Sequence, residues 1–90
     1  MIQGYIRGKQ RKAEDREIKT TVYNILRNTE IIGCKTMEYS LLLQRVCEHL
    51  EEIRFTYNIP QVEKCVSDMI LDNMLYRVTG TDEIRIGLVK

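Results

Sequence analysis

The chain has few of the residues that build dedicated chemical sites. Its 90 residues include one histidine, one proline, one phenylalanine and no tryptophan, and its three cysteines show no Cys-x-x-Cys spacing. A tetrahedral zinc site needs four converging ligands, and a cysteine–histidine nucleophile needs a third group to orient the base. Cys47 and His49 are two residues apart on a predicted helix and therefore face different sides, and His49 is the sole histidine. We therefore expect no metal, no cofactor, no catalytic residue and no enzymatic activity. The cysteines are expected to be reduced thiols packed as small apolar side chains; they are Cys34, Cys47 and Cys65.

Long apolar runs and phosphate-binding loops are also missing from the sequence. The longest apolar runs, such as Leu41–Leu43, are far too short to cross a bilayer, and residues 1–12 lack the apolar segment of a secretory signal. Gly4 and Gly8 lack the preceding strand and following helix that a phosphate-binding loop requires. We therefore expect no membrane partner and a location in the cytoplasm or nucleus.

The composition predicts one ordinary globular domain preceded by a basic arm. Hydrophobic residues make up 43% of the chain and charged residues 30%. Four of the fourteen basic residues lie in residues 1–12, which contain no acid, so the remainder carries ten basic against thirteen acidic side chains. We predict an arm or linker over residues 1–13 and a folded domain over residues 14–90. Such an arm is either solvated or a contact for nucleic acid or an acidic protein surface.

Three stretches repeat apolar residues at intervals of three and four, which is the period of a helix with one buried face. They predict helices over residues 14–28, 37–55 and 60–75. Thr36 is expected to cap the second helix, and Asn58 the third, where Pro60 suits the first turn because its missing N–H costs nothing there.

β-type patterns surround and follow these helices. Ile31–Ile32, followed by Gly33, is expected to form a short strand that joins the sheet. Leu75–Val78 and Glu83–Val89 are expected to form a hairpin around a turn that contains Gly80. The sequence therefore predicts an α+β fold, a winged helix with a three-helix core and a small antiparallel β-hairpin wing.

The predicted third helix has little positive charge for a helix that would read DNA. Residues 61–75 contain one cation, Lys64, against Glu63, Asp68 and Asp72, and the wing tip at 79–83 carries two acids and no cation. A DNA-binding winged helix needs Lys, Arg, Asn or Gln on the helix and cations facing the phosphates. We therefore predict a protein-interaction domain, with a DNA-binding transcriptional regulator as the alternative.

Five short motifs of the chain also occur together in a known family. They are Glu14-Asp15-Arg16 leading into the first helix, Arg54-Phe55 closing the second, Val62–Ile70 along the third, Met74-Leu75-Tyr76-Arg77 at its end and Ile84–Leu88 near the C-terminus. Through these motifs, residues 14–89 resemble the C-terminal winged-helix domain of cullins, which are scaffolds of ubiquitin ligases. The resemblance implies a scaffold or regulatory role in a ubiquitin ligase complex. It also implies partners among other protein subunits, such as ubiquitin-ligase components or a ubiquitin-like modifier.

The resemblance is incomplete at the position that cullins modify. In that family, a lysine near the end of the first helix receives the ubiquitin-like modifier, and the matching stretch here is Val22–Arg27. Arg27 stands where the lysine would be, and a guanidinium cannot act as the acceptor amine. Lys19 and Lys35 flank the helix and are the substitutes that the sequence offers.

The exposed sides of the first and third helices are the predicted protein-binding surfaces. The charge pattern and the resemblance together single out six positions. They are Tyr23, Asn24 and Arg27 in the first helix and Lys64, Asp68 and Asp72 in the third.

Overall fold

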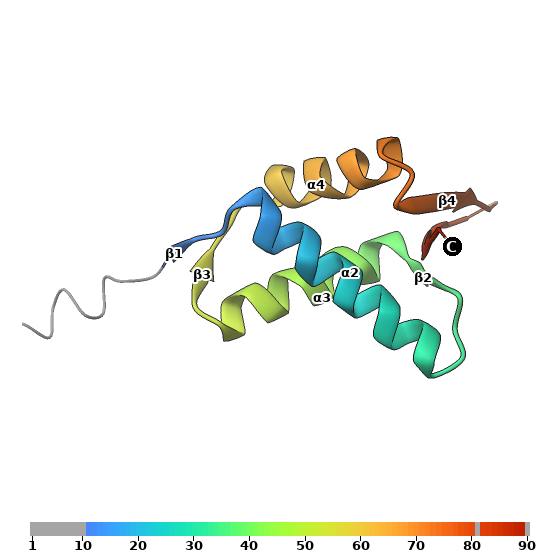
Figure 1. The fold of residues 1–90 in the computed structure, drawn as a ribbon, viewed down its shortest axis with the longest axis horizontal. Coiled ribbons are helices and arrows are strands. Elements are labelled where there is room, and N and C mark those ends of the chain that lie inside the picture. Colours follow the sequence, from blue (N-terminus) through green and yellow to red (C-terminus); the bar gives the residue numbers. More distant parts are fainter. Residues whose placement is uncertain (1–10, 81, 90) are drawn as a thin grey trace, which may run out of the picture.

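Three helices and two small sheets make up the structure, a computed structural model that describes residues 11–80 and 82–89 (Figure 1). Along the chain, the elements are β1 (Arg11–Lys12), α2 (Asp15–Ile31), β2 (Thr36–Glu38), α3 (Tyr39–Glu52), β3 (Phe55–Thr56), α4 (Ile59–Leu71), β4 (Leu75–Thr79) and β5 (Ile84–Leu88). Three helices followed by an antiparallel hairpin, with β2 added to the sheet, form a winged-helix topology. This confirms the predicted α+β fold class.

The larger sheet has the strand order β2-β5-β4, and both pairings are antiparallel. Its register places Met37 opposite Ile86, and Ile86 opposite Arg77 on the other side. Because side chains alternate between the two faces of a sheet, Met37 and Ile86 point together into the core. The sheet therefore closes one end of the helical core.

The core lies where one face of each helix meets the others and the inner face of the sheet. In Figure 1, α2 lies between α3 and α4, and it packs against both. The principal buried residues are Ile18, Val22 and Leu26 of α2, Leu42, Val46 and Leu50 of α3, Val62, Val66 and Met69 of α4, and Leu75 and Ile86 of the sheet. These residues follow the apolar period of the sequence, so burial of that stripe fixes how each helix is turned.

All three helices end with a residue in the left-handed region. The residues are Gly33 after α2, Arg54 after α3 and Asn73 after α4, with φ of 101°, 64° and 63°. After α4, the N–H of Met74 donates to the carbonyl of Met69 at 2.9 Å, and that of Asn73 donates to Ile70 at 3.0 Å. These bonds satisfy carbonyl groups that the helix leaves unpaired, so each helix stops where the chain turns.

The chain between α2 and α3 differs from the prediction. Helix α2 continues to Ile31, and Ile31 and Ile32 are 72% and 78% exposed, so the predicted strand at Ile31–Ile32 is wrong. The strand is β2, which begins at Thr36, so Thr36 is not the cap of the second helix. The physical reason is that the core buries Met37 rather than Ile31 or Ile32, so the segment around Met37 is the one that joins the sheet.

The predicted helix bounds also need correction at α3 and α4. Helix α3 covers Tyr39–Glu52, because its preceding residues belong to β2. Helix α4 begins at Ile59 with the Asn58 side chain accepting a hydrogen bond from the N–H of Gln61 at 2.9 Å, as predicted. It ends at Leu71, four residues before the predicted end, because Asn73 leaves the helical region.

The described chain enters the fold before residue 14, the predicted start of the domain. Strand β1 pairs in parallel with β3, and the buried Ala13 donates its N–H to the carbonyl of Thr56 at 2.7 Å. Residues 1–10 of the predicted arm lie outside the described residues. None of the described helices is long and apolar enough to cross a membrane.

Candidate protein-binding surface

Helix α2 has one buried face and one face open to solvent. A hydrogen bond of 2.8 Å from the Glu14 N–H to the Glu17 carboxylate fixes its start. On the buried side, the hydroxyls of Thr21 and Thr29 donate to the carbonyls of Glu17 and Ile25 at 2.8 and 2.9 Å, which satisfies these polar groups within the helix. The opposite face keeps its side chains available for contact.

The open face of α2 forms one wall of a shallow cavity of about 560 Å³, which we call the α2 groove. Its lining consists of Arg16, Lys19, Thr20, Tyr23 and Met74. Tyr23 is 37% exposed, and its hydroxyl accepts a hydrogen bond of 3.3 Å from Arg27 Nη1. Among the described residues, neither Arg16 nor Lys19 is in an ion pair. The groove therefore combines an apolar surface with positive charge.

The outer face of the β4–β5 hairpin carries a second aromatic residue, Tyr76. Leu75 is buried, so Tyr76 points to the other side of the sheet, where it lies opposite Gly87. A Cβ at Gly87 would lie 2.6 Å from the Tyr76 ring, so the ring rests directly against the glycine backbone. The absence of a side chain at Gly87 is what allows Tyr76 to lie flat on the sheet.

A second cavity of about 640 Å³ lies where the hairpin meets the end of α2, and we call it the hairpin groove. Its lining consists of Glu30, Gly33, Lys35, Tyr76, Leu88 and Val89. The two grooves are neighbours, because the N–H of Val89 donates to the carbonyl of Met74 at 3.0 Å. We refer to the two grooves and Arg27 together as the outer surface.

The structure brings some of the predicted site residues together. Tyr23 and Arg27 are joined by their hydrogen bond, and Asn24 is exposed beside Tyr23. The two lysines offered as substitutes are separated, because Lys19 lines the α2 groove and Lys35 lines the hairpin groove. Arg27, the equivalent of the modified lysine, is exposed on α2 between the grooves.

The predicted residues of α4 form a separate, internally paired set. Lys64 Nζ lies 3.2 Å from Asp68 Oδ2, one turn along the helix, and this hydrogen bond raises the pKa of Lys64. Asp72 is the exposed C-cap residue of the same helix. The exposed side of α4 therefore presents carboxylates, and the one cation of this helix, Lys64, is already paired with Asp68.

Sequence reasoning missed Arg16, Thr20, Met74 and Tyr76 as surface residues. The predicted third helix, residues 60–75, included Met74, but the helix ends before it and its side chain is 45% exposed. The alternation after Leu75 contained the signal for Tyr76, because one of two neighbouring strand residues must face away from the core. No local pattern could have joined Met74 to α2.

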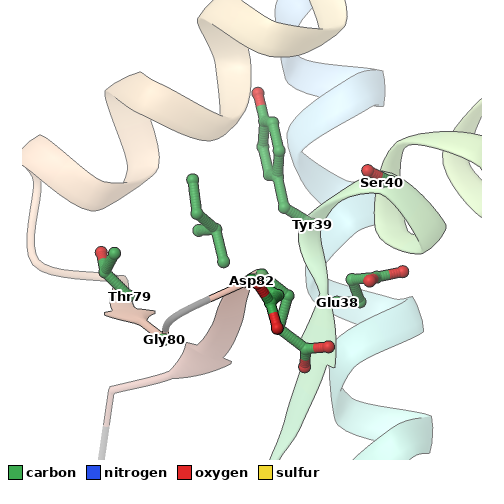
Figure 2. A pocket seen from close by; sticks show the side chains of 8 residues that line it. Glu38, Tyr39, Ser40, Thr79, Gly80 and Asp82 are labelled. Atoms are coloured by element: carbon green, nitrogen blue, oxygen red, sulfur yellow. The ribbon is translucent and has the colours of Figure 1, made fainter.

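A third pocket, of about 390 Å³, lies between the wing and the start of α3. Figure 2 shows Glu38, Tyr39 and Ser40 on one side of it, Thr79 and Gly80 of the wing on the other, and Asp82 of the wing between them. Glu38, Asp82 and Glu83 supply three carboxylates to its lining. Partial burial raises the pKa of Tyr39, so this phenol stays neutral at physiological pH. The pocket would repel an anion.

The cysteines do not gather at any of these sites. Cys47 and Cys65 are buried as predicted, and burial raises the pKa of both thiols, that of Cys65 to about 11. Cys34 is exposed, so the prediction of a packed thiol is wrong there, because it follows the turn at Gly33 outside the core. The described residues include no group of three or more His, Cys, Asp or Glu side chains placed to hold a metal ion.

These features describe a domain with two adjoining grooves on its outer surface, an acidic pocket beside the wing and a third helix with its cation paired. Comparison of the chain with family models, curated proteins and solved structures gives no match.

Proposed function

We propose that this domain is a protein-interaction module that resembles the cullin C-terminal winged-helix domain and has a scaffold or regulatory role in a ubiquitin ligase complex. The observation that carries the proposal is the charge on the surfaces that a winged helix would turn toward DNA. DNA-binding proteins obtain most of their non-specific affinity from Lys and Arg contacts to phosphates. On α4, Lys64 is paired with Asp68, and Glu63 and Asp72 are exposed.

The wing gives the same indication. Arg85 is held by Glu83 at 2.6 Å and donates from Nε to the Thr36 hydroxyl at 2.7 Å. Its guanidinium also donates to the Thr36 carbonyl at 3.0 Å, so much of its hydrogen-bonding capacity is used within the fold. The pocket between the wing and α3 is lined by carboxylates. A phosphate backbone laid against the wing tip would therefore meet negative charge, and Arg77 is the exposed cation of β4 farther from the tip.

The observation that favours the alternative, a DNA-binding regulator, is the basic start of the chain. Arg11 and Lys12 form β1 and are exposed. In Figure 1, β1 lies at the opposite end of the domain from the β4–β5 wing. Cations at that end would not supplement the phosphate contacts of the wing, so the protein-interaction module is the function we favour.

The resemblance to cullins concerns mainly residues that support the fold. Val62, Val66 and Met69 of the α4 motif are buried in the core. The position that cullins modify is occupied here by Arg27, whose guanidinium donates to Tyr23. We therefore propose a scaffold role without modification at Arg27, and Lys35 is the exposed lysine nearest in sequence to that helix end.

Titration of fluorescently labelled duplex DNA with the 90-residue chain tests the choice between the two functions. At low and moderate salt, we expect no binding above that of a neutral control protein. Submicromolar binding that falls steeply with salt would overturn the proposal, since phosphate contacts produce that dependence.

The ubiquitin-ligase context needs a positive test. We propose to add unlabelled RING subunit and ubiquitin-conjugating enzyme, separately, to the isotopically labelled chain and to follow amide resonances by NMR. Shifts confined to contiguous exposed residues support the role, and unchanged spectra with both proteins contradict it. Incubation with the modifier's ligation enzymes is expected to leave the domain without attached modifier, since Arg27 cannot accept it. If modifier is attached, its loss in Lys35→Arg would locate the attachment at Lys35.

A further inference from the structure

We propose that the outer surface binds an amphipathic helix of a partner protein whose apolar stripe is flanked by acidic residues. This inference rests on the proposed function, because it specifies the chemistry of the protein partner. It is carried by three properties of the outer surface: its exposed apolar side chains, its charge and its shape.

The apolar part of the outer surface is a strip that runs from α2 onto the hairpin. Tyr23 and Met74 face the α2 groove, and Tyr76 and Val89 face the hairpin groove. All four side chains are 37–45% exposed. Aromatic and methionine side chains are enriched at the centres of protein interfaces, where they supply contact area at low cost in side-chain entropy.

The charge around this strip is predominantly positive. The cations are Arg16 and Lys19 in the α2 groove, Arg27 between the grooves and Lys35 in the hairpin groove. Glu30 is the one acid among the described residues that line the two grooves. Carboxylates on both sides of an apolar stripe would complement this arrangement, and they would speed association and oppose partners of the wrong charge.

The shape of the outer surface favours a helix over an extended chain. From Arg16 to Glu30, α2 rises about 21 Å, which matches roughly four turns of a second helix lying along it. A strand adds to a protein by pairing its backbone with free backbone groups at a sheet edge. Such groups lie at the outer edges of β2 and β4, whereas the face of α2 offers none, because its N–H and C=O groups are bonded within the helix. Binding along α2 therefore depends on side chains at helical spacing.

A designed peptide tests this inference with the full 90-residue chain. The probe is a labelled 18-residue peptide with leucines at i, i+3, i+4 and i+7 spacing and glutamates on both sides of the stripe. A scrambled peptide of the same composition and a peptide with glutamine in place of glutamate are the controls. We expect the acidic stripe peptide to bind at least about tenfold more tightly than either control, with affinity falling as salt increases.

Variants locate the binding site on the domain. Arg16→Glu combined with Lys19→Glu, and separately Tyr23→Ala, should each weaken binding of the probe by about tenfold or more. Arg45→Glu, at an exposed position of α3 that lines neither groove, should change the affinity less than twofold. Circular dichroism verifies that each variant is folded. The Met74 methyl resonance of the unaltered chain should also shift on addition of the probe, which tests the site without any substitution.

Several outcomes would overturn the inference. Equal binding of the stripe and scrambled peptides, no binding at millimolar concentration, or variants that leave the affinity unchanged would each do so. Dimerisation of the chain that Tyr23→Ala abolishes would assign the surface to a second copy. If these results accompany negative DNA titrations, the proposed function stands and the inference alone fails. Tight DNA binding that requires Arg16 and Lys19 would remove both.

Discussion

Helices α2 and α4 are alike in construction and opposite in what they offer to a partner. Each buries one apolar stripe against the same core, with Leu26 and Met69 as examples, and each keeps an outer face exposed. On α2, that face carries Arg16 and Lys19 beside Tyr23, and a groove lies over it. On α4, the exposed cation Lys64 is paired with Asp68 on the same helix.

The difference shows that the α2 surface is completed by a neighbouring segment, whereas the charge of the α4 face is set within the helix itself. The α2 face becomes a groove because Met74, which follows the end of α4, lies against it. The α4 face remains internally satisfied because an acid lies one turn from its cation, which is the spacing at which side chains on a helix meet. The helix in the position of a DNA-reading helix is thus the less available of the two.

The largest losses of stability should come from truncating buried apolar side chains on the two helices. Leu26→Ala in α2 and Met69→Ala in α4 are each expected to lower the free energy of unfolding by about 2–5 kcal/mol, because both leave cavities in a closed core. Chemical denaturation measures the effect. The outer-face control Leu71→Ala, at a side chain that is 78% exposed, should stay within about 0.5 kcal/mol of the parent. A large loss for Leu71→Ala would contradict an open outer face on α4.

The next largest loss of stability is expected for Gly87→Ala in the hairpin, beneath the Tyr76 ring. Gly87→Ala is expected to cost about 1–3 kcal/mol, because the new methyl group would overlap the Tyr76 ring and force it off the sheet. Thermal unfolding measures the loss. In a Tyr76→Ala background the same substitution should cost much less, since the ring is gone. Equal costs in both backgrounds would show that Tyr76 does not rest on Gly87.

A smaller loss should follow from removing the cap of α4. Asn58→Ala is expected to destabilise the domain by about 1 kcal/mol, because the N–H of Gln61 loses its acceptor. Asn58→Asp retains an acceptor and is the matched control. Asn58 lines neither groove, so its substitutions should leave peptide binding at the outer surface unchanged. The link between the two helix starts is Gln61, whose side chain donates to the Ala13 carbonyl at 2.9 Å and to Asp15 at 3.2 Å. A change in that affinity would show that α4 and the α2 surface are coupled.

The smallest expected effect is a gain in stability at the helix ends. Arg54→Gly should raise the free energy of unfolding by about 0.5 kcal/mol, because glycine adopts a positive φ without the steric cost that arginine pays. Asn73→Gly should give less, since asparagine tolerates this region better than arginine does. Differential scanning calorimetry on both variants measures the ranking. A loss of stability for Arg54→Gly would mean that contacts of the arginine side chain outweigh the backbone term.

The sequence predicted those parts of the fold that depend on periodicity and local capping. Apolar spacing located all three helices, and Asn58 marked the start of α4. The prediction from the sequence failed at β2. This segment of three residues is too short to show a periodic pattern, and it is a strand because it pairs with β5. The prediction also misplaced Met74, because periodicity continues past a helix end that Asn73 sets through its backbone conformation.

The candidate site was predictable only in part. Tyr23, Asn24 and Arg27 could be placed on the exposed face of α2 from the position of its apolar stripe. Met74 and Tyr76 could not be added to that face, because their proximity to it depends on how α4 and the hairpin pack against α2. The sequence also left open which cations are paired, and the structure distinguishes Lys64 and Arg85 from Arg16 and Lys19.

By itself, the sequence determined a three-helix core with a hairpin and a third helix poor in positive charge, because periodicity and side-chain chemistry are local properties. Only the tertiary structure decided that β2 completes the sheet, that Met74 lies over α2, and that Tyr76 rests on Gly87. The first two depend on contacts between segments far apart in the chain, and the third depends on the register of the β4–β5 hairpin. Such contacts are selected by the burial of the whole core, which no short stretch of sequence specifies.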